Sequence, residues 1–264
     1  MEIKTMKVAV ITGASSGIGL ELARELSWRG VAVSLLARRK NLVDEAVLQL
    51  NAQGGSAIGF ECDVTDRNSV AAAVRATEER FGAVDLAVAN AGVGIPTPLR
   101  KFSLDDAVQV VTVNYIGMLN LIGAVLPKML ERKSGHLVGI ASLAGFRALP
   151  TSAGYSASKA AMQTFLEAAR VELRAKGVKV TIVNPGFVET AMTEKHKGSL
   201  PFVISVDKAA LRIADAIEQQ VAVLSFPLAS SIAMKLVRIL PGGLYDLAMG
   251  PLARRRVDET KVKR

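Results

Sequence analysis

Two side chains with acid–base chemistry, Tyr155 and Lys159, lie four residues apart, so a helix would place them on one face, a turn apart. A free tyrosine has a pKa of about 10 and is a poor base at neutral pH. A nearby ammonium would favour the phenolate, and lowering the pKa by about three units requires roughly 4 kcal/mol of differential stabilisation. Such a pair could donate a proton to a carbonyl oxygen or accept one from an alcohol. Pairs with this spacing are common by chance, so supporting motifs are needed.

A glycine-rich segment near the N-terminus is the first supporting motif. After a short apolar run and before helix-like sequence, the chain reads Thr12-Gly13-Ala14-Ser15-Ser16-Gly17-Ile18-Gly19. Gly13 permits a tight turn, Gly17 lets the backbone approach a phosphate, and Gly19 lets the helix pack closely on the strand. The helix N-terminus offers free N–H groups and a partial positive charge to an anion. The segment therefore predicts a site for the pyrophosphate of a dinucleotide.

Together these two motifs resemble the short-chain dehydrogenase/reductase family, in the branch with TGxxxGxG and YxxxK. Further landmarks of the family follow in the expected order: Asp63-Val64, Asn90-Ala91-Gly92, Asn114, Ser142, Pro185-Gly186 and Thr190. No single motif decides the assignment, but a chance match of all of them in register is implausible. The resemblance covers roughly residues 6–225.

The resemblance implies a catalytic set of Asn114, Ser142, Tyr155 and Lys159. Tyr155 would donate a proton to the carbonyl oxygen of the substrate as hydride arrives at its carbon, and Ser142 would hydrogen-bond the same oxygen. Lys159 would also hold the nicotinamide ribose, and Asn114 would fix a water that completes a proton relay. Considered singly, Ser142 could be a helix cap and Asn114 a buried structural amide.

The resemblance also implies a cofactor-binding set that spans the chain. Its members are Gly13, Ser15, Ser16, Gly17, Ile18, Gly19, Arg38, Arg39, Asp63, Val64, Asn90, Ala91, Gly92, Tyr155, Lys159, Pro185, Gly186, Val188 and Thr190. Within this set Asp63 would lie near the adenine, Thr190 would meet the carboxamide, and Asn90 would support the central strand.

The second predicted strand indicates which cofactor binds. In NAD sites an acidic residue near the end of this strand holds the ribose hydroxyls, but here Ala37 takes that place and Arg38 follows it. A guanidinium can bind a 2′-phosphate with charge-assisted hydrogen bonds worth roughly 1.5–3 kcal/mol. We therefore predict NADP(H). The alternative is that Arg38 and Arg39 only begin the next helix, in solvent.

Composition indicates one α/β domain, with residues 6–226 as its core and residues 227–264 as a C-terminal extension with a basic tail. The single cysteine, Cys62, excludes an internal disulfide and fits a reducing compartment. The two histidines, His136 and His196, lie far apart, so no metal site is expected. The first strand begins by about Lys7, which leaves no room for a signal peptide, so we expect a cytoplasmic protein.

Apolar runs alternate with amphipathic stretches, which predicts a Rossmann-like α/β fold: a doubly wound parallel sheet of about seven strands with helices on both faces. Strands are expected at residues 7–12, 31–36, 56–61, 84–90, 135–141, 178–183 and 221–226. Helices are expected at residues 17–29, 41–53, 69–80, 104–130, 155–176 and 208–219. Ligands of such sheets bind beyond the carboxyl ends of the strands.

The stretch from Ala107 to Pro127 carries no charge and has the length of a membrane span. Its polar residues, among them Asn114 and Asn120, would be costly in hydrocarbon, so a buried interface helix is the better interpretation. By resemblance, this helix and the one that carries Tyr155 form a four-helix subunit interface. We therefore predict a homodimer or homotetramer.

The expected substrate pocket is mostly apolar. Its predicted lining is Val93, Ile95, Leu143, Phe146, Leu149, Phe187 and Met192, beneath a mobile lid at residues 187–205. This favours a lipophilic carbonyl or alcohol as substrate. Two alternatives stay open: a carrier-linked 3-oxoacyl reductase, with Lys195, His196 and Lys197 meeting an acidic carrier, and a non-catalytic NADPH-binding sensor or scaffold. No motif supports nucleic-acid binding.

The extension combines apolar residues with Lys235 and Arg238, and the tail adds Arg254-Arg255-Arg256. It could lie weakly on a membrane surface, or it could close the substrate pocket or pack on a second subunit. We favour the pocket or subunit interpretation because Pro241-Gly242-Gly243 would break a long amphipathic face.

Overall fold

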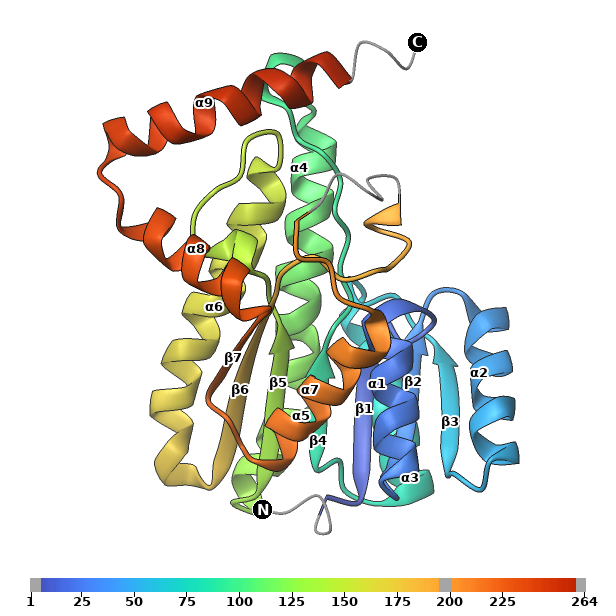
Figure 1. The fold of residues 1–264 in the computed structure, drawn as a ribbon. Helices are drawn as coiled ribbons and strands as arrows, with labels where there is room; N and C mark the ends of the chain where they lie inside the picture. The colour runs from blue at the N-terminus through green and yellow to red at the C-terminus, as the bar shows by residue number, and fades with distance from the viewer. Residues whose placement is uncertain (1–5, 195–200, 260–264) are drawn as a thin grey trace.

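The computed structural model describes residues 6–194 and 201–259. Its centre is a seven-stranded, fully parallel sheet in the order β3-β2-β1-β4-β5-β6-β7 (Figure 1). The strands are β1 (Val8–Thr12), β2 (Ala32–Ala37), β3 (Ala57–Glu61), β4 (Leu86–Ala89), β5 (Gly135–Ile140), β6 (Val178–Pro185) and β7 (Val223–Phe226). The strand order reverses between β1 and β4, which opens a crevice at their carboxyl ends. The predicted fold class is confirmed.

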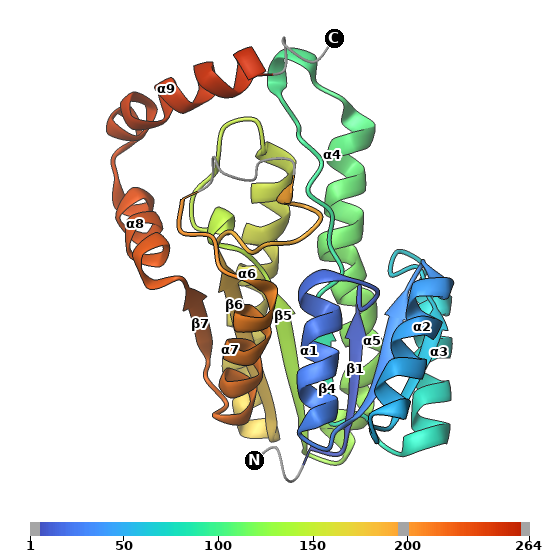
Figure 2. The same cartoon turned by 45° about the vertical axis from the view of Figure 1, so that its right-hand side comes forward.

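Helices cover both faces of the sheet, and a separate apolar core lies under each layer (Figures 1 and 2). The first layer is α1 (Gly17–Trp28), α2 (Lys40–Ala52) and α7 (Val206–Glu218), and the second is α3 (Arg67–Phe81), α5 (Gly117–Glu131) and α6 (Ala153–Leu173). Leu26 and Ile213 belong to the first core, and Leu121 and Leu166 to the second. Because both faces of the inner strands are covered, every residue of β1 and of β5 is buried, and these strands are largely apolar.

Two features differ from the predicted elements. The expected helix over residues 104–130 consists of α4 (Leu104–Val111), a π-helical segment η3 (Thr112–Ile116) and α5. The extension, for which no helix was predicted, forms α8 (Leu228–Ile239) and α9 (Gly242–Glu259). The helical backbone is interrupted between them at Leu240 and Pro241. Short 3₁₀ turns complete the elements: η2 (Leu99–Lys101), η4 (Leu143–Gly145) and η5 (Arg174–Lys176).

The continuous helical stretch Leu104–Glu131 is apolar and long enough to cross a membrane, with a mean hydropathy of 1.6 in its most apolar window. Within the described residues it is the one stretch that meets both criteria. Several of its large side chains, Met118, Leu121, Val125 and Met129, pack into the core under the sheet. One face of the stretch therefore packs in the core, and 39% of its most apolar window is buried.

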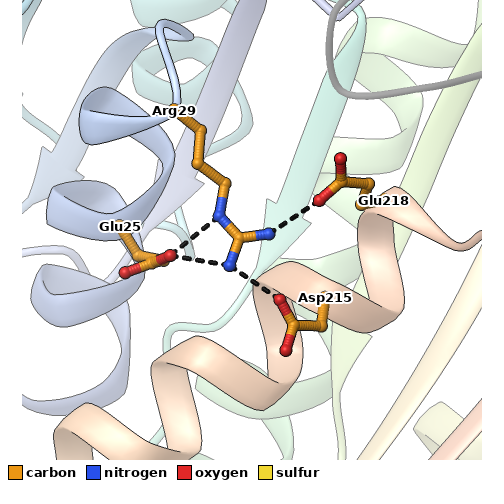
Figure 3. Close-up of polar contacts among 4 residues, drawn as sticks. All are labelled: Glu25, Arg29, Asp215 and Glu218. Atoms are coloured by element: carbon orange, nitrogen blue, oxygen red, sulfur yellow. Dashed lines mark hydrogen bonds and ion pairs between the residues drawn. The ribbon is translucent and has the colours of Figure 1, made fainter.

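One ion-pair network ties α1 to α7 (Figure 3). Arg29 follows the last residue of α1 and contacts Glu25 Oε1 through Nε and Nη2, both at 2.7 Å. From α7, Asp215 and Glu218 accept at 2.7 and 2.9 Å. The two α7 carboxylates are nearly half exposed, so each ion pair alone contributes little to the stability of the fold. Several carboxylates on one guanidinium fix the side chains more firmly than an isolated pair does. It keeps α7 beside the helix that begins at the glycine segment.

A buried histidine sits in β5, away from the predicted site. His136 Nε2 lies 2.8 Å from Thr181 Oγ1, and Thr181 donates its hydroxyl hydrogen to Val221 O at 2.7 Å. Nε2 therefore carries the proton and donates to Thr181, which leaves Nδ1 buried and without a partner. Burial, aided by the charge of Lys179, lowers the pKa of His136 to about 4.

We expect His136 to make the fold acid-sensitive. Its folded pKa lies below the usual 6.5, so the unfolded chain binds the proton first, and stability falls as the pH drops from about 6.5 towards 4. The loss attributable to this residue should reach roughly 3 kcal/mol. Urea unfolding at several pH values should show a shallower decline for His136→Gln than for the unaltered protein. Identical slopes would contradict this assignment.

Candidate active site

The candidate residues gather at the carboxyl edge of the sheet, as their positions at strand ends predicted. β1 ends at Thr12, directly before the glycine segment, and β4 ends at Ala89, directly before Asn90. β5 ends two residues before Ser142, and β6 contains Pro185 as its last residue. α6 places Tyr155 and Lys159 in its first two turns.

The glycine segment is locked to the loop after β4. Gly13 has a φ of +66°, and a Cβ added there would lie 2.7 Å from Ala91 Cα. Thr12 Oγ1 accepts the N–H groups of Asn90 and Ala91 at 3.0 and 3.1 Å, and Asn90 Nδ2 donates to Thr12 O at 2.9 Å. At Gly19 a Cβ would collide with the Asn90 amide. The backbone at the start of α1 is thus kept free of side chains, which fits the pyrophosphate of a dinucleotide.

The two arginines after β2 lie in different surroundings. Arg38 lines a pocket of about 310 Å³, together with Asp63, Thr65, Asp105, Val108, Gln109, Thr112 and Val113. Arg39 turns to the glycine segment, where its Nη2 donates to Ser15 Oγ at 2.9 Å and to Ser16 Oγ at 2.6 Å. The structure therefore brings Arg38 to Asp63, and Arg39 to the serines of the cofactor loop.

Asp63 is held as a carboxylate at the floor of this pocket. Although partial burial opposes ionisation, the backbone N–H and the hydroxyl of Thr65 donate to Asp63 Oδ1 at 2.9 and 2.8 Å. These bonds and the charge of Arg38 lower the pKa of Asp63 below its usual value. The side chain of the next residue, Val64, packs on α5 near Gly117, so only its backbone faces the loop region.

The Ser142 hydroxyl lies beside the Tyr155 hydroxyl, where its interaction favours the ionised form of the phenol. Ser142 also caps the turn η4, since its Oγ accepts the Ala144 N–H at 3.1 Å. The residue therefore acts as a helix cap and also lies beside Tyr155. Burial raises the pKa of the Tyr155 phenol above its usual value, and the interaction with Ser142 opposes this only in part. The direction is opposite to the one expected from a neighbouring ammonium.

Lys159 is buried beside Tyr155, so its charged form is destabilised as well. The residue is only 4% exposed, its Nζ donates to Ile140 O at 2.7 Å, and Met162 Sδ lies 3.6 Å away. Burial lowers the pKa of Lys159 to about 7, so its ammonium is half neutralised near pH 7. Its Nζ lies 5.8 Å from the centre of the Tyr155 ring. A Cβ on Gly92 would lie 3.5 Å from the same Nζ, which places the predicted Gly92 beside the lysine.

Asn114 lies in the π-helical segment and is almost fully buried. Its Oδ1 accepts the Val93 N–H at 2.8 Å, and its Nδ2 donates to Val93 O at 3.1 Å and to Ser158 Oγ at 2.9 Å. The side chain therefore ties the loop after β4 to α6. π-Helical turns often occur at functional sites, because they displace one residue from the helical register.

Two supporting residues were missed from the sequence. Ser158 accepts from Asn114 and donates to Tyr155 O at 2.7 Å. Gln163 Nε2 donates to Ser142 O and to Asn184 Oδ1, both at 2.7 Å. Ser158 lies inside the Tyr155–Lys159 motif and Gln163 one turn after it, so helical spacing offered a signal. Their partners Asn114, Ser142 and Asn184 come from elsewhere in the chain.

The segment after β6 completes the site. Gly186 N donates to Phe226 O at 2.7 Å, and a Cβ on Gly17 would lie 3.3 Å from Thr190 Cγ2, which places Thr190 against the glycine segment. Val188 is buried and forms an isolated β-bridge with Ile204, so the two ends of the predicted lid lie side by side. Ile18, by contrast, packs its side chain against the core under α1. Residues 195–200, with Lys195, His196 and Lys197, lie outside the described residues.

Comparison with known proteins places this chain among oxidoreductases. The family described as short chain dehydrogenase matches residues 7–199. An uncharacterized oxidoreductase from Myxococcus xanthus is 39% identical over 242 residues, which cover 92% of this chain and 96% of that protein.

Two crystal structures are also similar. Actinorhodin polyketide ketoreductase with NADPH has a TM-score of 0.80 and 31% identity, covering 88% of this chain and 99% of its own. An alcohol dehydrogenase from the archaeon Thermococcus sibiricus, complexed with 5-hydroxy-NADP, has a TM-score of 0.76 and 29% identity, covering 84% and 95%.

Proposed function

The chain belongs to the short-chain dehydrogenase family and is an enzyme that acts on CH–OH or C=O groups with a nicotinamide cofactor; on that premise we propose that it uses NADP(H) and a lipophilic small molecule. The observation that carries the proposal is that Tyr155, Ser142 and Lys159 lie together, with Lys159 Nζ 5.8 Å from the centre of the Tyr155 ring, at the sheet edge that also bears the glycine segment. These groups come from β5, α6 and β1, so their meeting is a property of the fold.

In the direction of reduction, the cofactor supplies the hydride that reaches the carbonyl carbon. Tyr155 would donate its phenolic proton to the carbonyl oxygen, and its raised pKa keeps that proton in place at neutral pH. Ser142 would hydrogen-bond the same oxygen and hold it within reach. Lys159 would stabilise the phenolate that remains, since a nearby ammonium favours the charged form. Asn114 would orient α6 through Ser158 and, as the family pattern implies, support the relay that returns a proton.

The preference for NADP(H) is supported by the residues at the end of β2. Ala37 stands where a ribose-binding carboxylate would be needed for NAD, and Arg38 lines the pocket beside Asp63. The two similar crystal structures named above contain NADPH and 5-hydroxy-NADP, so those two proteins bind cofactors of the NADP type.

The apolar residues around the site support a lipophilic substrate. Leu143 is buried next to Ser142, and a Cβ on Gly94 would lie 3.0 Å from Met192 Sδ, so the segment after β6 closes on the loop after β4. The similar ketoreductase favours reduction of a ketone. A carrier-linked 3-oxoacyl reductase remains the second candidate.

A substrate panel tests the proposal. Purified protein with NADPH should be offered aliphatic, aromatic and cyclic ketones, aldehydes and a 3-oxoacyl thioester, with NADPH absorbance as the readout. We expect oxidation of NADPH with apolar ketones. Activity restricted to the thioester would select the carrier-linked candidate. NADPH binding without turnover on any compound would support a sensor or scaffold and overturn the enzymatic proposal.

We also propose that the extension closes the substrate side of the site. Arg147, five residues after Ser142, donates from Nη1 to Arg238 O and Leu240 O at 3.0 and 3.2 Å, where α8 ends. Its guanidinium stacks 4.4 Å from the Tyr245 ring centre, and the Tyr245 hydroxyl donates to Ala148 O at 2.7 Å. The connection between α8 and α9 is thus held by these contacts to the segment between Ser142 and Tyr155.

Arg147→Ala should raise KM for the carbonyl substrate by about fivefold or more, because the loss of hydrogen bonds worth about 1 kcal/mol loosens this cover. The Kd for NADPH should not change, since the glycine segment is untouched. Arg212→Ala, an exposed arginine on α7, is the matched control. Truncation after Phe226 should abolish activity on soluble substrates or prevent folding. Full activity of the truncated protein on those substrates would contradict the cover.

A homo-oligomer is proposed for the face formed by η3 and α6. Tyr115 and Phe165 pack edge to face there, with ring centres 6.3 Å apart, and Ile116 and Val171 are exposed, the latter to 68%. Exposed aliphatic side chains beside an aromatic pair are typical of a subunit interface. We expect a dimer or tetramer in light scattering at micromolar concentration and a smaller species for Val171→Glu. A monomeric unaltered protein would contradict the interface.

A further inference from the structure

The outer face of α8 is unusually apolar for a solvent-facing helix. Leu228, Ile232, Leu236 and Ile239 are exposed by 71, 50, 58 and 76%, and their spacing of four, four and three residues puts them on one face. We call these four residues the α8 stripe. At the start of α9, Leu244 and Leu247 are exposed by 54 and 76% and extend the apolar surface past the break. Such a contiguous patch indicates a binding surface.

A basic side chain accompanies the α8 stripe, and α8 itself contains no acidic residue. Lys235 is exposed on this helix, whereas the guanidinium of Arg238 lies 6.0 Å from the centre of the Phe146 ring. From Pro227 to Tyr245 the sequence contains no aspartate or glutamate. The sequence of α9 then adds Arg254, Arg255 and Arg256. An apolar helix face with cations and no carboxylate on the same helix matches the composition of helices that lie in the interface of a membrane with anionic lipids. The nearest acidic residue is Asp246, which is exposed between Leu244 and Leu247 on α9.

The inner side of the extension is already occupied. Ser231 is buried, and Arg147 binds the backbone at the end of α8. Figures 1 and 2 both show α8 and α9 rising from the end of β7 at the carboxyl edge of the sheet, with α9 extending towards the segment before α4. The α8 stripe therefore uses a different face from the contact that covers the active site, and both uses are compatible.

We propose that the α8 stripe, with Leu244 and Leu247, docks this protein on an anionic lipid bilayer. A second copy of the chain is a poorer occupant, because a symmetric contact through the α8 stripe would bring Lys235 close to its own copy, and α8 has no carboxylate to pair it. In a bilayer the acyl chains would surround the apolar side chains of the α8 stripe, and the lipid phosphates would pair with Lys235. The docking does not depend on which carbonyl compound the enzyme reduces.

Vesicle sedimentation with the full chain tests the docking. Phosphatidylcholine vesicles serve as the neutral surface, and vesicles with about 30% phosphatidylglycerol as the anionic one. We expect binding to the anionic vesicles to be at least about tenfold tighter. The double variant Leu236→Ser/Ile239→Ser should lose about tenfold or more of that binding. Lys235→Gln should lose about fivefold, and only on anionic vesicles.

Leu48→Ser is the matched control, since Leu48 is 71% exposed on α2, far from the extension in the fold. It should leave vesicle binding unchanged. Equal binding to both vesicle types, or equal binding by the double variant, would overturn the docking. A double variant that binds vesicles normally but has a smaller mass in light scattering would show a subunit interface instead. Circular dichroism confirms folding, and NADPH oxidation with a soluble ketone, which these variants should retain, separates this result from the proposed activity.

Discussion

Tyr155→Phe will lower kcat by about 10²–10⁴-fold, because the phenolic hydroxyl is the proton donor to the carbonyl oxygen and phenylalanine has no proton to give. The ring remains, so the packing of α6 and the contact with the cofactor should persist. The Kd for NADPH, measured by fluorescence titration, should therefore change less than about threefold. Steady-state oxidation of NADPH with the best ketone from the panel measures kcat.

Companion variants separate the roles of the neighbouring groups. Tyr115→Phe makes the same chemical change on a ring that packs against Phe165, and it should leave kcat unaltered. Lys159→Ala should impair both kcat and NADPH binding, since the lysine serves the tyrosine and the ribose. Substantial turnover by Tyr155→Phe would mean that another acid protonates the substrate.

NADPH will bind at least about tenfold more tightly than NADH, and Ala37→Asp will reverse much of that preference. The aspartate would repel the 2′-phosphate and could accept the ribose hydroxyls of NADH. Ala37 is the last residue of β2 and directly precedes Arg38, which lines the pocket with Asp63, so the new carboxylate would lie at the carboxyl edge of the sheet. Titration of both cofactors against each protein gives the four dissociation constants.

Arg38→Ala should lower NADPH affinity by about ten- to a hundredfold, the value of one charge-assisted contact, and leave NADH affinity nearly unchanged. Arg67→Ala, an exposed arginine at the start of α3, is the control for a simple change in net charge. Equal affinities of the unaltered protein for NADPH and NADH would refute the assigned role of Arg38.

The glycine segment and the strand pattern were predictable because their signals are local. Parallel strands covered on both faces must be apolar throughout, and a turn such as that at Gly13 needs a residue that tolerates positive φ. Alternation of such runs with amphipathic helices determined the sheet and the edge at which ligands bind. The helices α8 and α9 were not predicted, because Pro241-Gly242-Gly243 interrupts the extension, although the apolar residues of α8 recur at helical spacing.

The electrostatic state of the site was decided only by the tertiary structure. From sequence, Lys159 and the positive charge of an oxidised nicotinamide were expected to lower the pKa of Tyr155. Folding buries Lys159 and part of Tyr155, and it aims Lys159 Nζ at Ile140 O. The bonds of Asn114 to Ser158 and of Gln163 to Ser142 likewise join residues that are more than twenty positions apart. A motif specifies which groups are present and how they repeat along one helix. Desolvation and partner choice depend on atoms contributed by other strands and helices, so they exist only once the chain has folded.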